Sequence, residues 1–201
     1  MTVRMELQRA LSDPEAVLTS IGESSAFEQV FDRHVRTIYR FAWRRVGDNL
    51  ANDVTAETFT VAFAKRADFD PEVGEVLPWL FGIATNVIRA HRRAERRRLL
   101  AYLRTGIDPL GAVEPIEDRI DSLAAGPALA RALAHLRPND RDVLLLYAWG
   151  DLSYEEISRS LGIPIGTVAS RMSRARRTLR TALEAAGWSR GSADELEGDD
   201  R

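Results

Sequence analysis

Helical periodicity constrains the fold of this chain more than any other feature of its sequence. Apolar residues recur every three or four positions from Phe27 to Phe41 and again over residues 77–91, which places them on one face of an α-helix. The expected helices cover residues 26–46, Asn52 or Asp53 to about Arg66, about Pro78 to about Arg104, 128–136, 140–149, 153–161 and 165–186. No strand-rich segment accompanies them, so the sequence predicts an all-α fold.

Charge divides the chain into two basic blocks. Residues 26–105 hold 14 basic against 10 acidic residues, and residues 128–190 hold 10 against 6, a balance of +4 in each block. Between them, residues 106–127 contain one basic and five acidic residues with three prolines and three glycines, a composition typical of a linker. We expect two small helical domains, 26–105 and 128–187, joined by this flexible acidic linker. An N-terminal extension (1–25) precedes them, and an acidic tail (188–201) follows.

Composition argues against several classes of protein. The chain has no cysteine, which excludes disulfides, iron–sulfur clusters and cysteine nucleophiles. Its longest nearly unbroken apolar stretch, 76–84, is too short to span a membrane, and the N-terminus lacks an apolar signal segment, so we expect a cytoplasmic protein. His34, His91 and His135 are scattered without catalytic or metal-ligand spacing, and His91 continues an apolar stripe. We therefore expect no enzymatic activity, no metal and no cofactor.

The sharpest local motif lies at residues 152–180. Ser153 and Glu156 form a capping-box pattern, and Gly162-Ile-Pro164 is a tight turn before a second helix, so the segment predicts a helix-turn-helix. On the second helix, the face opposite the apolar stripe carries Ser170, Arg174 and Arg177. Such a face suits a DNA major groove and its phosphates, although a plain helical hairpin with a solvated basic face would show the same pattern.

A second basic feature occupies the end of the helix expected from Pro78. Arg89, Arg92, Arg93 and Arg96 share an arc away from the apolar stripe, with Asn86 one turn earlier. These arginines can follow a phosphate backbone while Asn86 reaches a base edge. The alternative is a solvated helix C-terminus, where arginines also complement the helix dipole.

Three motifs in order carry a resemblance to a known family. They are the helix-turn-helix with Gly-Thr-Val-Ala-Ser-Arg (166–171) and Arg-Ala-Arg (174–176), Asp-Val-Thr-Ala-Glu-Thr-Phe-Thr-Val-Ala-Phe (53–63), and Pro-Trp-Leu-Phe-Gly-Ile-Ala-Thr-Asn-Val-Ile-Arg-Ala-His-Arg (78–92). Together they resemble the extracytoplasmic-function class of bacterial sigma factors, over roughly residues 26–186. Two residues depart from the family pattern: Ala56 stands where glutamine is usual, and Ala169 where a basic residue is common.

The resemblance implies a role in transcription initiation. The first domain would bind the clamp helices of core RNA polymerase through Asp53, Glu57 and Phe59. It would also read the −10 element with Asn86, while Trp79 would either wedge into DNA or pack. The second domain would bind the polymerase flap and read the −35 element through the helix that holds Thr167, Ser170, Arg171, Arg174 and Arg177. The partners implied are core RNA polymerase, promoter DNA and an anti-sigma factor.

Two other functions also fit a helix-turn-helix. An ordinary transcriptional regulator would need a ligand-binding or dimerisation domain, and a DNA recombinase would need a catalytic α/β domain; residues 26–105 predict neither.

We also expect the acidic linker and tail to fold over the arginine faces and weaken non-specific DNA binding.

Overall fold

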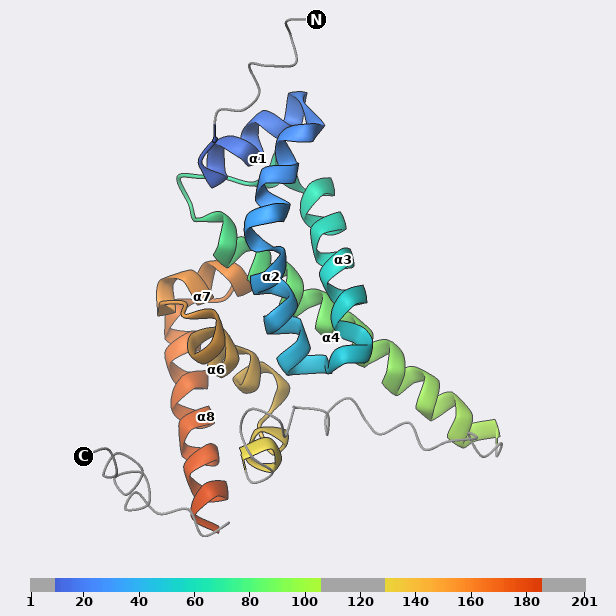
Figure 1. Ribbon diagram of the computed structural model, residues 1–201. Helices are drawn as coiled ribbons and strands as arrows, with labels where there is room; N and C mark the ends of the chain where they lie inside the picture. Colours follow the sequence, from blue (N-terminus) through green and yellow to red (C-terminus); the bar gives the residue numbers. More distant parts are fainter. Residues whose placement is uncertain (1–9, 106–128, 186–201) are drawn as a thin grey trace, which may run out of the picture.

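The fold is entirely helical in the part of the chain that the structure describes. It is a computed structural model, and it describes residues 10–105 and 129–185 (Figure 1). Residues 129–134 are also helical and precede α6. The elements run in the order α1 (Asp13–Gly22), the 3-10 turn η1 (Ser24–Ala26), α2 (Phe27–Val46), α3 (Asp48–Ala64), the 3-10 turn η2 (Arg66–Asp68), α4 (Val76–Thr105), α6 (Pro138–Gly150), α7 (Tyr154–Leu161) and α8 (Ile165–Ala185). The expected all-α fold is confirmed.

The first unit, residues 10–105, is built around α2, α3 and α4. Edge-to-face aromatic pairs join these helices: Phe31 on α2 meets Phe59 on α3 at 4.9 Å between ring centroids, and Phe41 on α2 meets Phe81 on α4 at 4.8 Å. The end of α4 projects beyond the other helices (Figure 1), and its last side chains from Arg96 onward are exposed where they are described. This unit thus has a packed core and one protruding basic helix end.

Helix α1 lies within the segment expected to be only an N-terminal extension. The Glu15 carboxylate accepts hydrogen bonds from the backbone N–H and the hydroxyl of Ser12, which caps the start of the helix. Asp13 binds the Arg33 guanidinium at 2.7 Å and His34 Nε2 at 2.6 Å, so α1 is tied to α2. Burial raises the pKa of Asp13, but these two partners outweigh it and lower the pKa overall.

Helix α3 begins earlier than the sequence pattern suggests. We expected its start at Asn52 or Asp53, but it begins at Asp48, directly after α2 ends. Gly47 joins the two helices with a φ of 71°, a left-handed conformation that glycine adopts at little cost. Because one residue reverses the chain, no loop separates α2 from α3.

The second unit, residues 129–185, contains the expected helix-turn-helix. The Ser153 hydroxyl accepts a hydrogen bond from the Glu156 N–H, and the Glu156 carboxylate accepts one from the Ser153 N–H, which confirms the capping box of α7. Gly162 then turns the chain with a φ of 62°. Ile157, Val168 and Met172 are fully buried between α7 and α8. Ile165, which the helical spacing predicts on the same apolar stripe as Val168 and Met172, is instead 46% exposed.

The two units pack directly on each other. Figure 1 shows α7 beside α4, and the Ser160 hydroxyl on α7 donates a hydrogen bond to the Pro78 carbonyl on α4 at 2.7 Å. The acidic linker and tail lie outside the described residues. None of the described helices is both long and apolar enough to cross a membrane.

Candidate nucleic-acid interface

The outer face of α8 carries the expected recognition residues. Ser170 and Arg177 are exposed, while Thr167, Arg171 and Arg174 are half-buried. Arg174 Nε and Nη2 donate to the two carboxylate oxygens of Asp140 at 3.2 and 3.0 Å, and this hydrogen bonding raises the pKa of Arg174. Two of the guanidinium nitrogens are therefore already engaged within the unit.

The basic end of α4 is divided into an open part and a covered part. Asn86, Arg93 and Arg96 are exposed. Arg89 is only 24% exposed, because its Nε donates to Asp142 Oδ2 at 2.6 Å, and Arg92 Nη2 donates to the Arg45 carbonyl at 3.1 Å. Of the four arginines expected on an arc away from the apolar stripe, Arg89 is thus partly covered by Asp142 on α6, and Arg92 is partly covered by α2.

The three residues expected to bind polymerase occupy α3 in different environments. Asp53 and Glu57 are exposed, and Glu57 binds His91 Nε2 at 2.7 Å. The place of His91 on the apolar stripe predicts a packed side chain, but His91 is partly exposed and hydrogen-bonded to Glu57 on α3. Phe59 is 5% exposed against Phe31, so it supports α3 from the core rather than presenting a surface.

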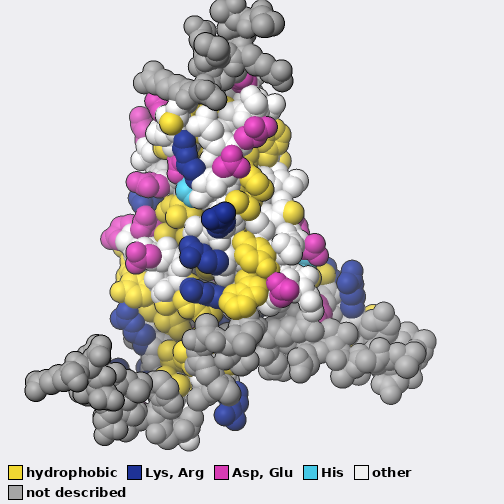
Figure 2. Space-filling view, in the orientation of Figure 1, with side chains coloured by type: hydrophobic (Ala, Val, Ile, Leu, Met, Phe, Trp, Pro, Cys, Tyr) yellow, Lys and Arg dark blue, Asp and Glu magenta, His cyan; other side chains and the backbone are white. Residues whose placement is uncertain are grey.

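A basic, partly apolar groove that the sequence did not predict lies between α2 and α3. Figure 2 shows a row of basic side chains over the position of α2, with hydrophobic side chains beside it. The exposed Arg36 and Arg40 line this groove with Phe31, Val35, Tyr39, Asn52, Thr55 and Ala56. Arginines four positions apart on α2 share a helix face, and this spacing was the signal available in the sequence.

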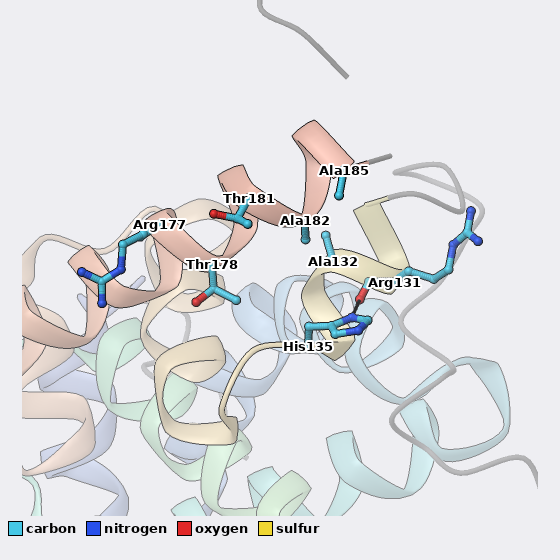
Figure 3. Close-up of a pocket in the computed structure, with 8 residues that line it drawn as sticks. All are labelled: Arg131, Ala132, His135, Arg177, Thr178, Thr181, Ala182 and Ala185. Atoms are coloured by element: carbon cyan, nitrogen blue, oxygen red, sulfur yellow. Dashed lines mark hydrogen bonds between the residues drawn. The ribbon is translucent and has the colours of Figure 1, made fainter. Parts of the chain in front are cut away.

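A second groove lies between residues 129–134 and the end of α8. Figure 3 shows Ala132, Ala182 and Ala185 facing one another, with Thr178 and Thr181 alongside and Arg131, His135 and Arg177 at the edges. His135 Nδ1 lies 2.7 Å from the Arg131 carbonyl oxygen, which holds the imidazole at one rim. Small side chains on both walls leave a shallow, mainly apolar trough.

Trp79 packs against the protein rather than standing free. Its ring lies 5.2 Å from the ring of Phe69, in the loop that precedes α4, and it is partly buried on the core. Of the two roles open for this residue, the structure shows packing.

Two family models match the two units in order. The model described as "Sigma-70 region 2" matches residues 30–98, and the one described as "Sigma-70, region 4" matches residues 127–179. The first match includes α4 with Asn86, and the second contains the helix-turn-helix.

Two proteins that are similar to this chain in sequence are ECF RNA polymerase sigma factors. The chain is 34% identical over 174 residues to the ECF RNA polymerase sigma factor SigE of Mycolicibacterium smegmatis, covering 84% of this chain and 66% of SigE. It is 31% identical to the ECF RNA polymerase sigma factor SigL of Mycobacterium tuberculosis, covering 84% of this chain and 94% of SigL.

A solved structure of another protein shares the fold of this chain. CnrH, solved in complex with the cytosolic domain of CnrY, superimposes with a TM-score of 0.60 at 27% identity, covering 88% of this chain and 99% of CnrH. The two region models, the extent of the match to SigL and this shared fold agree. The chain therefore belongs to the family of ECF RNA polymerase sigma factors.

Proposed function

We propose that this protein binds core RNA polymerase and directs it to promoters by recognising a −10 and a −35 element. The observation that carries the proposal is the pair of sigma regions, in order on one chain, each with a basic helix that has exposed side chains. A single helix-turn-helix would fit many transcriptional regulators. A chain that also carries a unit matching Sigma-70 region 2 does not fit an ordinary regulator.

The −10 element is the proposed target of α4. Asn86 is exposed one turn before the arginines, and its amide can donate to and accept from a base edge. Arg93 and Arg96 follow on exposed positions where they can contact phosphates, and Arg89 and Arg92 extend the same side of the helix once they are uncovered.

The −35 element is the proposed target of α8. The helix presents Ser170 and Arg177 to solvent, with Thr167, Arg171 and Arg174 beside them. The ion pair with Asp140 holds the Arg174 guanidinium in one orientation, which reduces the entropy lost when the side chain meets DNA.

Two grooves are the proposed polymerase contacts. The α2/α3 groove combines apolar side chains with Arg36 and Arg40 and adjoins the exposed Asp53 and Glu57, so it suits the clamp helices. The trough between residues 129–134 and α8 suits an apolar tip of the flap. We propose residues 26–105 and 128–187 as the two functional domains, with α1 joined to the first through Asp13.

The remaining proposals concern catalytic activity, cellular location and a regulatory partner. We propose no catalytic activity for this chain and place its action in the cytoplasm, where polymerase and chromosome meet. CnrH was solved with the cytosolic domain of CnrY, and this likeness supports a protein partner for this chain as well. An anti-sigma factor is the partner that the family resemblance implies.

Co-purification with core RNA polymerase, followed by run-off transcription on a genomic promoter library, tests the proposal. We expect a stoichiometric complex that starts transcription at sites sharing paired elements, while core enzyme alone starts at none of them. A chain that binds those sites tightly without polymerase, and does not co-purify with it, is an ordinary regulator and contradicts the proposal.

A further inference from the structure

The last third of α4 continues the helix face that carries Asn86. At 3.6 residues per turn, three later residues fall within about 40° of Asn86 around the helix axis: Arg93, Arg97 and Leu100. All three are exposed, and Leu100, at 57%, is the most exposed large apolar side chain among the described residues. One face of α4 thus presents an amide, two guanidinium groups and a large apolar side chain in a row.

The core of the first unit does not bury this part of the helix. The end of α4 projects away from the other helices in Figure 1, and residues 96–101 are exposed. The family model for region 2 ends at residue 98, so Leu100 lies beyond the part of the chain that it matches. Packing within the unit therefore does not explain the pattern of side chains on this face, and a binding role is the alternative.

The charge of the segment favours a polyanion as its partner. Residues 93–101 hold four arginines against one glutamate. The major groove of duplex DNA is about 12 Å wide and admits an α-helix, its edges carry phosphates that arginine binds, and the C5 methyl group of thymine gives it apolar surface. A basic face with one large apolar side chain matches this combination. An acidic protein surface would satisfy the charge, but it would not explain why the face continues from Asn86.

The length of α4 determines how far such a contact lies from Asn86. Arg97 follows Asn86 by eleven residues and Leu100 by fourteen, which are rises of about 16 and 21 Å along the helix. At about 3.4 Å per base pair, these rises equal about five and six base pairs. The strands separate from the −10 element toward the start site, so the DNA that stays double-stranded beside Asn86 lies on the −35 side.

We infer that the end of α4 is a further DNA-binding site, whose ligand is the duplex between the two promoter elements, about five or six base pairs from the base that Asn86 reads. Arg93 and Arg97 bind backbone phosphates there, and Leu100 contacts the C5 methyl group of a thymine. The inference rests on the proposed function, because it places Asn86 at the −10 element. It adds a base preference outside the −10 and −35 elements.

Deoxyuridine in place of thymine removes the C5 methyl group and tests the contact with Leu100. The probe is a promoter fragment from the run-off experiment that has thymines in the half of the spacer next to the −10 element, with each of them replaced by deoxyuridine. Polymerase holding the parent chain should bind this fragment about fourfold more weakly than the unmodified one, the value of one buried methyl group. Polymerase holding Leu100→Ala should bind both fragments equally. Deoxyuridine in the other half of the spacer is the control and should change neither affinity.

Matched variants on the two sides of α4 test the face itself. Arg97→Ala should reduce the slope of log affinity against log salt by about 0.9, the effect of one lost phosphate contact. Arg98→Ala is the control, because Arg98 is also exposed but lies about 120° from Asn86 around the helix. Leu99→Ala serves in the same way for Leu100, since Leu99 is 45% exposed and also lies off this face. Alanine favours the helix, so all of these variants should keep the melting temperature of the parent chain.

Each outcome bears on a different part of the inference. An equal effect of deoxyuridine on the parent chain and on Leu100→Ala, or no effect on either, overturns the thymine contact. Equal salt slopes for Arg97→Ala and Arg98→Ala overturn the phosphate contact. Weaker binding of Leu100→Ala to core polymerase without DNA would place this face on a protein and overturn the DNA site as a whole. A parent chain that starts no transcription contradicts the proposed function instead, because every comparison between variants uses a promoter that the parent chain opens.

Discussion

Asn86 and Arg89 lie three residues apart on α4, yet the structure gives them different environments. Asn86 is exposed to solvent, while Arg89 is held by Asp142 from the second unit. Arg174 shows the same effect on α8, where Asp140 engages two of its nitrogens. At the scale of a residue, helical spacing indicates which side a side chain occupies, but a neighbouring carboxylate decides whether it is available.

Asn86→Ala should impair promoter opening and leave polymerase binding intact. Because the side chain is exposed, its loss opens no cavity, and the free energy of unfolding should change by less than about 0.5 kcal/mol. Loss of a base contact should reduce open-complex formation about tenfold. Permanganate footprinting measures opening, and affinity for core polymerase is the control. Equal losses in both would assign Asn86 a structural role.

Arg174→Lys should weaken binding to the −35 element while the unit stays folded. Lysine keeps a positive charge near Asp140, which is 7% exposed and would otherwise lose its partner, but it lacks the guanidinium fork. We expect about a tenfold loss of affinity for a cognate −35 duplex, the value of one charge-assisted hydrogen bond. Arg180→Lys, exposed two turns further along α8, is the matched control, and equal effects of the two would contradict a specific role.

At the scale of elements, the helix-turn-helix is determined by short-range chemistry. The Ser153–Glu156 capping box starts α7, and Gly162 ends it in a left-handed conformation. The hydrogen bonds from Ser153 lower the pKa of Glu156, because they favour its ionised form. Helix α1 begins with the same Ser-x-x-Glu pattern at Ser12 and Glu15, so the sequence of residues 1–25 already held the signal for a helix there.

Ser153→Ala should lower the free energy of unfolding of the second unit by about 1 kcal/mol at pH 7. Because the folded pKa of Glu156 is depressed, the stabilisation is present above its ordinary value of 4.5 and is lost as pH falls through the folded pKa. The gap between parent and variant in urea unfolding should therefore narrow below pH 4.5. A gap that stays constant down to pH 3 would mean that the Glu156 carboxylate contributes nothing to the cap.

At the scale of the molecule, a buried ion pair joins the two units. Arg45 on α2 is fully buried, and its partner Asp142 on α6 lies 97 positions later in the chain. Asp142 also accepts a hydrogen bond from Arg89 on α4, so this contact forms only while both units are folded and packed on each other.

The sequence by itself determined the helices, the helix-turn-helix and the family, because periodicity, capping and turn glycines act over a few residues. It placed Asn86, Ser170 and Arg177 on exposed faces for the same reason. It could not place Arg89 and Arg92, since Arg89 is held by Asp142, 53 positions later, and Arg92 by the carbonyl of Arg45, 47 positions earlier. No local pattern encodes either approach. It also gave no sign that Gly82 would meet Ser160, because close backbone contact is a property of two docked helices. Only the tertiary structure decided which basic residues are open and which are covered, since long-range packing and the pairing of buried charge set that difference.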